Sequence, residues 1–242
     1  MNYFIKYLLV VLLTIPSLAN AQRHKKPQNL VRYDFKKIHF GFSLGINALN
    51  FNIKKNDDFL ANDSLLSMLS QDQKGFNLGG GGGGGGIVSN LRLGKYTDLR
   101  FIPTLVFGER ILNYQFTDQN NNSLKSKRIE STLIDFPISL KYKSERYNNF
   151  RTYVMCGVKY SLDIASQSTI DDEGQELVKL NNHDIMIEGG FGIDFYLQYF
   201  KFSPQIKISH GIINILSRDK TVYTQTINNL KTSGWMLSFT FE

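Results

Sequence analysis

The chain has 242 residues, of which 42% are hydrophobic and 13% aromatic, and its formal net charge is +7. This much apolar surface excludes a chain that is disordered over most of its length, because it would bury itself somewhere. The single cysteine excludes a disulfide framework and a cysteine-based zinc site. After residue 21 no apolar run reaches the roughly 18–20 residues of a spanning helix, which excludes a helical membrane protein.

The first 21 residues are predicted to be a cleaved signal peptide. Lys6 supplies a positive charge, residues 7–15 form a short apolar core, and Ala19-Asn20-Ala21 is typical of a cleavage site. We therefore expect the protein to leave the cytoplasm. The absence of cysteine pairs favours a periplasmic or outer-membrane destination over a disulfide-stapled secreted domain.

The strongest pattern in the rest of the chain is an alternation with a period of two residues. In residues 39–47, Phe, Leu and Ile at even positions alternate with small or polar residues at odd positions, which helical spacing does not explain. The same pattern predicts seven further strands, near residues 87–93, 99–107, 133–142, 151–162, 184–197, 202–209 and 235–241.

Most of these eight segments have the length of about nine residues that a tilted strand needs to cross a bilayer. Their connections alternate between long and short, which predicts an all-β, eight-stranded antiparallel up-and-down transmembrane β-barrel of the outer-membrane type. The short turns and both termini would face the periplasm. The long connections are 52–74, 117–126, 165–182 and 213–230, and the short ones are 94–97, 144–149 and 198–200. The predicted organisation is a signal peptide (1–21), a periplasmic arm (22–38) and the barrel (39–242).

A soluble lipocalin-like barrel also alternates, but its apolar residues face inward. Here one face of nearly every strand is continuously apolar, while the other face mixes Gly, Ser and charges. An eight-stranded barrel has room inside only for side chains, so we expect a plug of paired charges. We also expect Arg100 and Asp135 to approach each other, directly or through a neighbour. The candidate members are Arg92, Arg100, Lys141, Lys159 and Lys207 with Asp135, Asp184, Glu188 and Asp194.

Three local features interrupt the pattern. Pro103, Pro137 and Pro204 fall within predicted strands and are expected to mark bulges near the periplasmic rim. The tract Gly79–Gly86 is expected to bulge out or to lie in an outer loop, with the strand starting near Gly86, because glycine is a poor strand former. In the loop 52–74, Asp63 or Ser64 is a candidate cap for a short helix that carries Leu65, Leu66, Met68 and Leu69.

No pattern predicts an enzyme, a cofactor or a metal site. The histidines, His24, His39, His183 and His210, lack metal-ligand spacing, and the glycine tract lacks the lysine of a phosphate loop. Cys156 lies on an apolar strand face and is interpreted as a small hydrophobic residue. The basic residues are dispersed except for Arg23-His24-Lys25-Lys26, which favours solvent or anionic lipid over nucleic acid as their neighbour. No small-molecule substrate is predicted.

Several stretches resemble the PorT (SprT) family, outer-membrane components of the type IX secretion system. They are HFGFSLGIN (39–47), VSNLRLGKYTDLRFIPTLVFGER (88–110), STLIDFPISLKYKSERYNNFRTYV (131–154) and FKFSPQIKISHG (200–211). The resemblance implies a barrel needed for protein export to the cell surface, and for gliding in motile relatives, with other secretion-system proteins as partners. It assigns no catalytic, cofactor-binding or metal-binding residue.

The size of the barrel restricts this role, because an eight-stranded lumen cannot pass even an extended protein. We therefore expect an accessory component of secretion, not the pore. An alternative is a general surface barrel that binds ligands or adheres through its long loops, and a further one is an enzyme acting at the outer rim. A His/Asp or Ser/His set at the rim would favour the enzyme, whereas loops folded over the mouth would favour the partner role.

Overall fold

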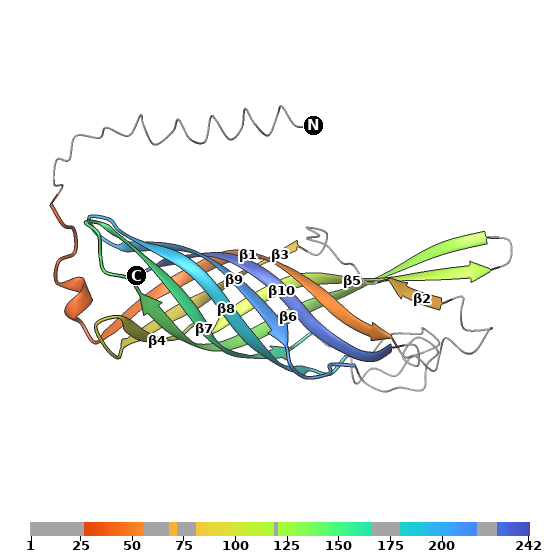
Figure 1. Ribbon diagram of the computed structural model, residues 1–242. Helices are drawn as coiled ribbons and strands as arrows, with labels where there is room; N and C mark the ends of the chain where they lie inside the picture. The colour runs from red at the N-terminus through yellow and green to blue at the C-terminus, as the bar shows by residue number, and fades with distance from the viewer. Residues whose placement is uncertain (1–26, 56–67, 72–80, 119–120, 166–179, 217–226) are drawn as a thin grey trace, which may run out of the picture.

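The computed structural model describes residues 27–55, 68–71, 81–118, 121–165, 180–216 and 227–242. Ten strands form one antiparallel sheet that curls into a barrel (Figure 1). They are β1 (Ile38–Lys55), β2 (Met68–Gln71), β3 (Gly81–Arg92), β4 (Thr97–Phe101), β5 (Thr104–Asp118), β6 (Asn121–Lys143), β7 (Phe150–Asp163), β8 (His183–Tyr196), β9 (Lys201–Gly211) and β10 (Ile227–Phe241). Across the described residues, no helix is long and apolar enough to cross a membrane.

The barrel closes through β1, which pairs with β10 on one side and with β3 on the other. The strands β4 and β5 are two halves of one strand, because both pair with β3 and with β6 in the same register on either side of Ile102 and Pro103. The strand β2 adds to the outer part of β5 and is not part of the ring. The ring therefore has eight strands, which confirms the predicted fold class.

The predicted division into an apolar outer face and a polar inner face is confirmed. On β7, for example, Val154 and Val158 are 53% exposed, whereas Lys159 is buried. On β1, Phe40 is 71% exposed and Ser43 is 5% exposed. Apolar residues on the outside and charges on the inside are the arrangement of a membrane barrel and the reverse of a soluble one.

The predicted short turns 94–97, 144–149 and 198–200 lie at the end of the barrel near the arm, which we call the periplasmic end (Figure 1). At the other end the strands run further than predicted. Because β5 continues to Asp118 and β6 begins at Asn121, most of the predicted loop 117–126 is a two-stranded ribbon that projects beyond the ring (Figure 1).

The prediction of a short helix in the loop 52–74 is wrong for the part of this loop that the structure describes. Met68 and Leu69 belong to the strand β2, which pairs with Phe116 and Gln115 of β5. The reason is that the edge of β5 beyond the ring offers unpaired backbone groups to a neighbouring strand. The rest of that helix, the signal peptide and residues 23–26 lie outside the described residues.

The three prolines do not mark register shifts. Register is the same on both sides of Pro103 and of Pro137, and these two prolines lie at one interruption in the β4/β5–β6 ladder. The β8–β9 ladder likewise skips the step at Pro204 and resumes in the same register. The predicted bulges are therefore wrong, because a missing N–H removes ladder bonds without inserting a residue.

The prediction for the glycine tract is also wrong. Gly81–Gly86 form the first half of β3 and pair with residues 43–48 of β1, and Gly83–Gly86 pair also with β5. Glycine is suited to this place because the neighbouring backbone is close: a Cβ on Gly86 would lie 2.4 Å from the carbonyl oxygen of Pro103. The first two residues of the tract, 79 and 80, lie outside the described residues.

We predict opposite effects for two neighbouring glycines. Gly86→Ala should destabilise the barrel by about 1–3 kcal/mol, because its methyl group would overlap backbone. Gly85→Ala, whose Cβ would meet only ordinary contacts at 3.4 Å or more, should be neutral or stabilise by about 0.5 kcal/mol. The free energy of unfolding, measured by urea titration of the folded barrel in lipid, checks both. Equal effects of the two variants would contradict the role assigned to the glycines.

Candidate functional site

The interior of the barrel is the most specialised part of the described chain, and it is layered along the barrel axis. Close to the periplasmic end, just beyond the buried Lys143–Asp98 ion pair, lies a buried ion-pair network around Arg100. The Arg100 guanidinium contacts the Glu242 carboxylate and donates to Oε1 of Gln205 at 3.0 Å. The Lys201 ammonium donates to the other Glu242 oxygen at 2.7 Å. Two cations, one on β4 and one on β9, thus share one buried carboxylate.

A second ion pair completes this layer. The Lys141 ammonium lies 2.8 Å from Oδ1 of Asp194, and the Ser203 hydroxyl donates to the same oxygen at 2.6 Å. Lys141 also lies over the ring of Tyr153, 3.6 Å from its centroid, and the Tyr153 hydroxyl donates to Gln205. We call Arg100, Lys141, Asp194, Lys201 and Glu242 the lower charge layer. Its charges are buried, paired and hydrogen-bonded, which is the condition under which buried ions are tolerated.

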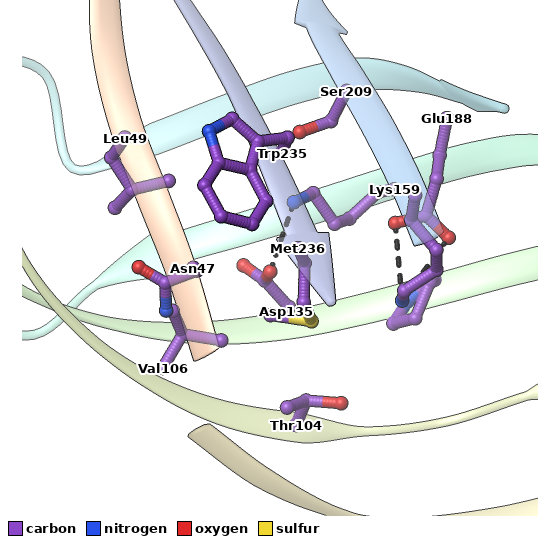
Figure 2. Close-up of a pocket in the computed structure, with 12 residues that line it drawn as sticks. Asn47, Leu49, Thr104, Val106, Asp135, Lys159, Glu188, Ser209, Trp235 and Met236 are labelled. Carbon is purple, nitrogen blue, oxygen red and sulfur yellow. Dashed lines mark hydrogen bonds and ion pairs between the residues drawn. The ribbon is translucent and has the colours of Figure 1, made fainter. Parts of the chain in front are cut away.

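The next layer outward, the upper charge layer, contains Asp135, Lys159, Glu188 and Lys207. Lys159 lies 3.0 Å from Asp135, which also accepts a 2.6 Å hydrogen bond from Ser161. Lys207 lies 3.4 Å from Glu188. Figure 2 shows Asp135, Lys159 and Glu188 around a cavity of about 20 Å³. That volume holds about one water molecule, so the cavity is not a passage for a solute.

Above the two charge layers, apolar side chains also help to fill the lumen. Leu49, Val106 and Leu133 form a buried cluster, and Met236 packs against it. Leu230 of β10 and Met186 of β8 are also buried. Buried polar residues lie at the same height, because Asp163, Asp184 and Thr232 line a small cavity together with Leu133 and Met186. The outer part of the described lumen is therefore filled by apolar and polar side chains together.

The periplasmic mouth is covered by residues 27–37, which we call the docked arm. Its Tyr33 ring stacks on His39 at 4.1 Å, and the Tyr33 hydroxyl donates to Glu242 at 3.1 Å. Burial, followed by the charge of Glu242, raises the pKa of Tyr33 above its ordinary value, so this hydroxyl stays protonated and continues to donate.

Asp34 fastens the docked arm to two further strands. Its Oδ1 accepts hydrogen bonds from Arg151 at 2.5 Å and from the Tyr196 hydroxyl at 2.9 Å. Nearer the start of the arm, the Asn29 backbone N–H donates to Asn149 at 2.8 Å, and the Asn29 side chain donates to the Tyr196 carbonyl at 3.0 Å. The arm is therefore tied by side-chain and backbone contacts across the mouth.

The predicted ion plug is confirmed, but its pairing is partly wrong. Lys141, Lys159 and Lys207 pair with predicted acidic partners. Arg100 and Asp135 both face the lumen, yet each takes another partner, Glu242 and Lys159 respectively. Register explains this, because Asp135 lies opposite Thr104, four residues along the strand from Arg100. Lys159 on the neighbouring strand β7 lies diagonally next to Asp135, opposite Pro137.

The other predicted members have different surroundings. Arg92 is partly buried and donates to the carbonyl oxygens of Gly94 and Asp34 at the periplasmic rim, and Asp184 is buried in the outer part of the lumen. Glu242, Tyr33 and Asp34 were not predicted as functional residues. The sequence offers one signal for Glu242, a charged residue that directly follows the alternating aromatic residues Phe239 and Phe241.

No catalytic or metal-binding constellation is found in the described part of the chain. There, no group of three or more His, Cys, Asp or Glu side chains has an arrangement that could hold a metal ion. His39 is engaged with Tyr33, and His183 contacts the Tyr160 hydroxyl at 2.5 Å. His210 is exposed on β9, and His24 lies outside the described residues.

A closed eight-stranded antiparallel ring with an apolar outer face and an ion-paired interior defines an outer-membrane β-barrel. The family comparison agrees: residues 20–217 match the model of the outer membrane protein beta-barrel domain family. The chain belongs to this family, and its location is the outer membrane.

Solved structures similar to this chain include outer-membrane proteins of two bacteria. The chain resembles OprG from Pseudomonas aeruginosa with 14% identity and a TM-score of 0.43, over 90% of this chain and 97% of OprG. It also resembles Ail, the attachment invasion locus protein of Yersinia pestis, with 9% identity and a TM-score of 0.35, over 85% of this chain and 98% of Ail. Among curated proteins, none matches the sequence.

We predict that Glu242→Gln destabilises the folded barrel by about 3–5 kcal/mol, because it leaves Arg100 and Lys201 buried without their shared carboxylate. Urea unfolding in lipid, followed by the heat-modifiable shift of the folded band on gels, measures the loss. The matched control is Glu145→Gln, which removes an exposed surface pair with Lys95 and should leave the unfolding midpoint unchanged. A midpoint for Glu242→Gln equal to that of wild type would contradict the lower charge layer.

A second prediction concerns the docked arm. Asp34→Asn should weaken the contacts to Arg151 and Tyr196 and expose residues 27–37 to protease, because a neutral amide replaces the carboxylate that two strands share. Limited proteolysis of the folded barrel in detergent, with the cleavage sites identified by mass spectrometry, tests this. The barrel itself should stay resistant. If the arm of Asp34→Asn is cleaved no faster than that of wild type, Asp34 does not fasten it.

Proposed function

We propose that this barrel is an accessory component of type IX protein secretion to the cell surface, and of gliding in motile relatives, and that it has no catalytic role. Two lines support the proposal. Four stretches that together cover much of the barrel resemble the PorT family, and the interior has the properties of a structural plug. The partners would be other proteins of the secretion system.

The observation that favours a partner role over a conduit is the filled lumen. Its two charge layers are buried and paired, its outer layer is filled by buried apolar and polar side chains, and the arm covers the periplasmic mouth. A cargo protein would have to displace all four obstacles in a ring that has room only for side chains. The contribution of this chain to secretion would therefore come from its surfaces.

Two surfaces are available for such contacts. At the periplasmic end, the docked arm presents exposed Val31 and Phe35 beside exposed Tyr199. At the outer end, β6 continues to Asn121, whereas its pairing with β7 ends at Leu133 and Asp163. Within the described residues, the stretch 121–131 of β6 pairs with β5 alone. An open strand edge of this kind can accept an extended segment of another protein.

The decisive test is genetic. Deletion of the gene should leave cargo proteins of the secretion system inside the cell, measured by surface labelling and by immunoblots of the medium. Complementation with Asp135→Asn should restore secretion in proportion to the amount of folded barrel, because that carboxylate serves stability alone. A deletion strain with normal surface cargo would reject the secretion role and favour the alternative of a ligand-binding or adhesive barrel.

The filled lumen is tested separately by conductance. The purified barrel, inserted into a planar bilayer, should show no sustained ion current, since buried and ion-paired side chains fill the described lumen. A variant without residues 27–37 should remain closed, because both charge layers stay in place. Stable channel steps in the full-length barrel would overturn the accessory role in favour of a pore.

A further inference from the structure

The apolar outer face of the barrel has a sharp upper boundary on β1. Outward residues of this strand are apolar from Ile38 to Ala48 and polar from Asn50 onward. The apolar part covers about 34 Å along the strand, at about 3.4 Å per residue. With a tilt of about 45°, it spans roughly 24 Å across the membrane, close to the apolar band of about 25 Å in such barrels. Asn50, Asn52 and Lys54 therefore lie at the height of the outer-leaflet headgroups.

The neighbouring strands continue this polar surface. Register places Lys231 of β10 opposite Asn52, and places Asn229 of β10 opposite Lys54. The two lysines are thus diagonal neighbours on the outer face, at a separation of about 7–8 Å. On the next strand, His210 of β9 lies opposite Ser233 of β10. We call Asn52, Lys54, Lys231, Ser233 and His210 the outer basic patch.

The patch has no acidic counterpart on its own strands. The strands β1, β9 and β10, which lie side by side (Figure 1), contain no Asp and no Glu along their whole length. Lys54 and His210 are exposed and Lys231 is partly exposed, and the structure gives none of the three an acidic side-chain partner among the described residues. The other charges of these strands at inward positions, such as Lys207, are paired inside the lumen.

We propose that the outer basic patch binds the phosphate of an anionic lipid headgroup in the outer leaflet. Two lysines at diagonal positions repel each other unless an anion lies between them, and a headgroup phosphate would be presented at this height. Lys54 and Lys231 donate to the phosphate oxygens, while the Asn52 amide and the Ser233 hydroxyl supply neutral donors. The apolar belt below the patch packs the acyl chains. This site is independent of the secretion role, since it requires only the location in the outer membrane.

The test uses the folded full chain in detergent, titrated with bisphosphorylated lipid A in the same detergent. Trp235, the only tryptophan of the chain, lies on β10 two residues from Ser233 and reports binding through its fluorescence. The double variant Lys54→Gln/Lys231→Gln should bind about 25-fold more weakly, at about fivefold for each lysine removed. The double variant with arginine at both positions should keep wild-type affinity. The matched control is Lys95→Gln, an exposed lysine at the periplasmic end, which should change nothing.

Two further titrations identify the source of the phosphate. Dephosphorylated lipid A should bind wild type no better than it binds the double variant. Inorganic phosphate at millimolar concentration should not displace lipid A, because it lacks acyl chains for the belt. Equal lipid A affinity of wild type and the glutamine double variant would overturn the proposal, and so would full displacement by inorganic phosphate, which would indicate a site for a soluble anion. Heat-modifiable migration of each variant confirms that the barrel is folded.

Discussion

Everything in this molecule depends on how an eight-stranded ring fills its own interior. A ring of this size leaves space for side chains and for little else, so the inward residues must satisfy one another without the help of bulk water. The chain does this with charges, and each buried charge makes its partner indispensable. Arg100 is tolerable only with Glu242 beside it, and Lys141 only with Asp194. Because the charged residues of most strands are paired inside the lumen, the outer face of the barrel can be apolar along most of its height.

The same constraint explains the docked arm. A lower charge layer that opened directly to the periplasm would lose ion pairs to competing water. On the ring strands the buried ion pair of Lys143 and Asp98 lies on its periplasmic side, and the arm adds to this cover. Tyr33 and Asp34 meet this need from outside the ring: one donates to Glu242 and the other receives donors from β7 and β8. The arm thus completes the plug and also displays apolar side chains such as Phe35 toward the periplasm, where a partner can meet them.

Sequence reasoning reached the fold because the period-two alternation is a local signal that each strand carries for itself. For the same reason, the alternation correctly predicted that Lys159, Lys207 and Asp194 face the lumen. It failed where the outcome depends on strands distant in sequence. The partner of Arg100 is set by tilt and stagger around the ring, and the pairing of Gly81–Gly86 is set by how closely β1 and β5 approach. Neither the stagger of the strands nor their distance of approach can be derived from the local sequence around these residues. The docking of the arm could not be predicted, because it depends on contacts with residues more than a hundred positions away.

The distribution of charge between inside and outside separates the structural residues from those available for recognition. Inward charges occur on most strands and are matched by opposite charges, which is what stability requires. On β1, β9 and β10 the outward bases at the upper edge of the belt have no acid on the same strands, and stability alone does not account for two lysines side by side. A wall that is apolar over the thickness of a bilayer and basic where the headgroups begin is matched to a lipid with a phosphate at that height. The interior of this barrel therefore keeps it closed, while its outer wall, arm and ribbon are left to make contact with lipid and protein.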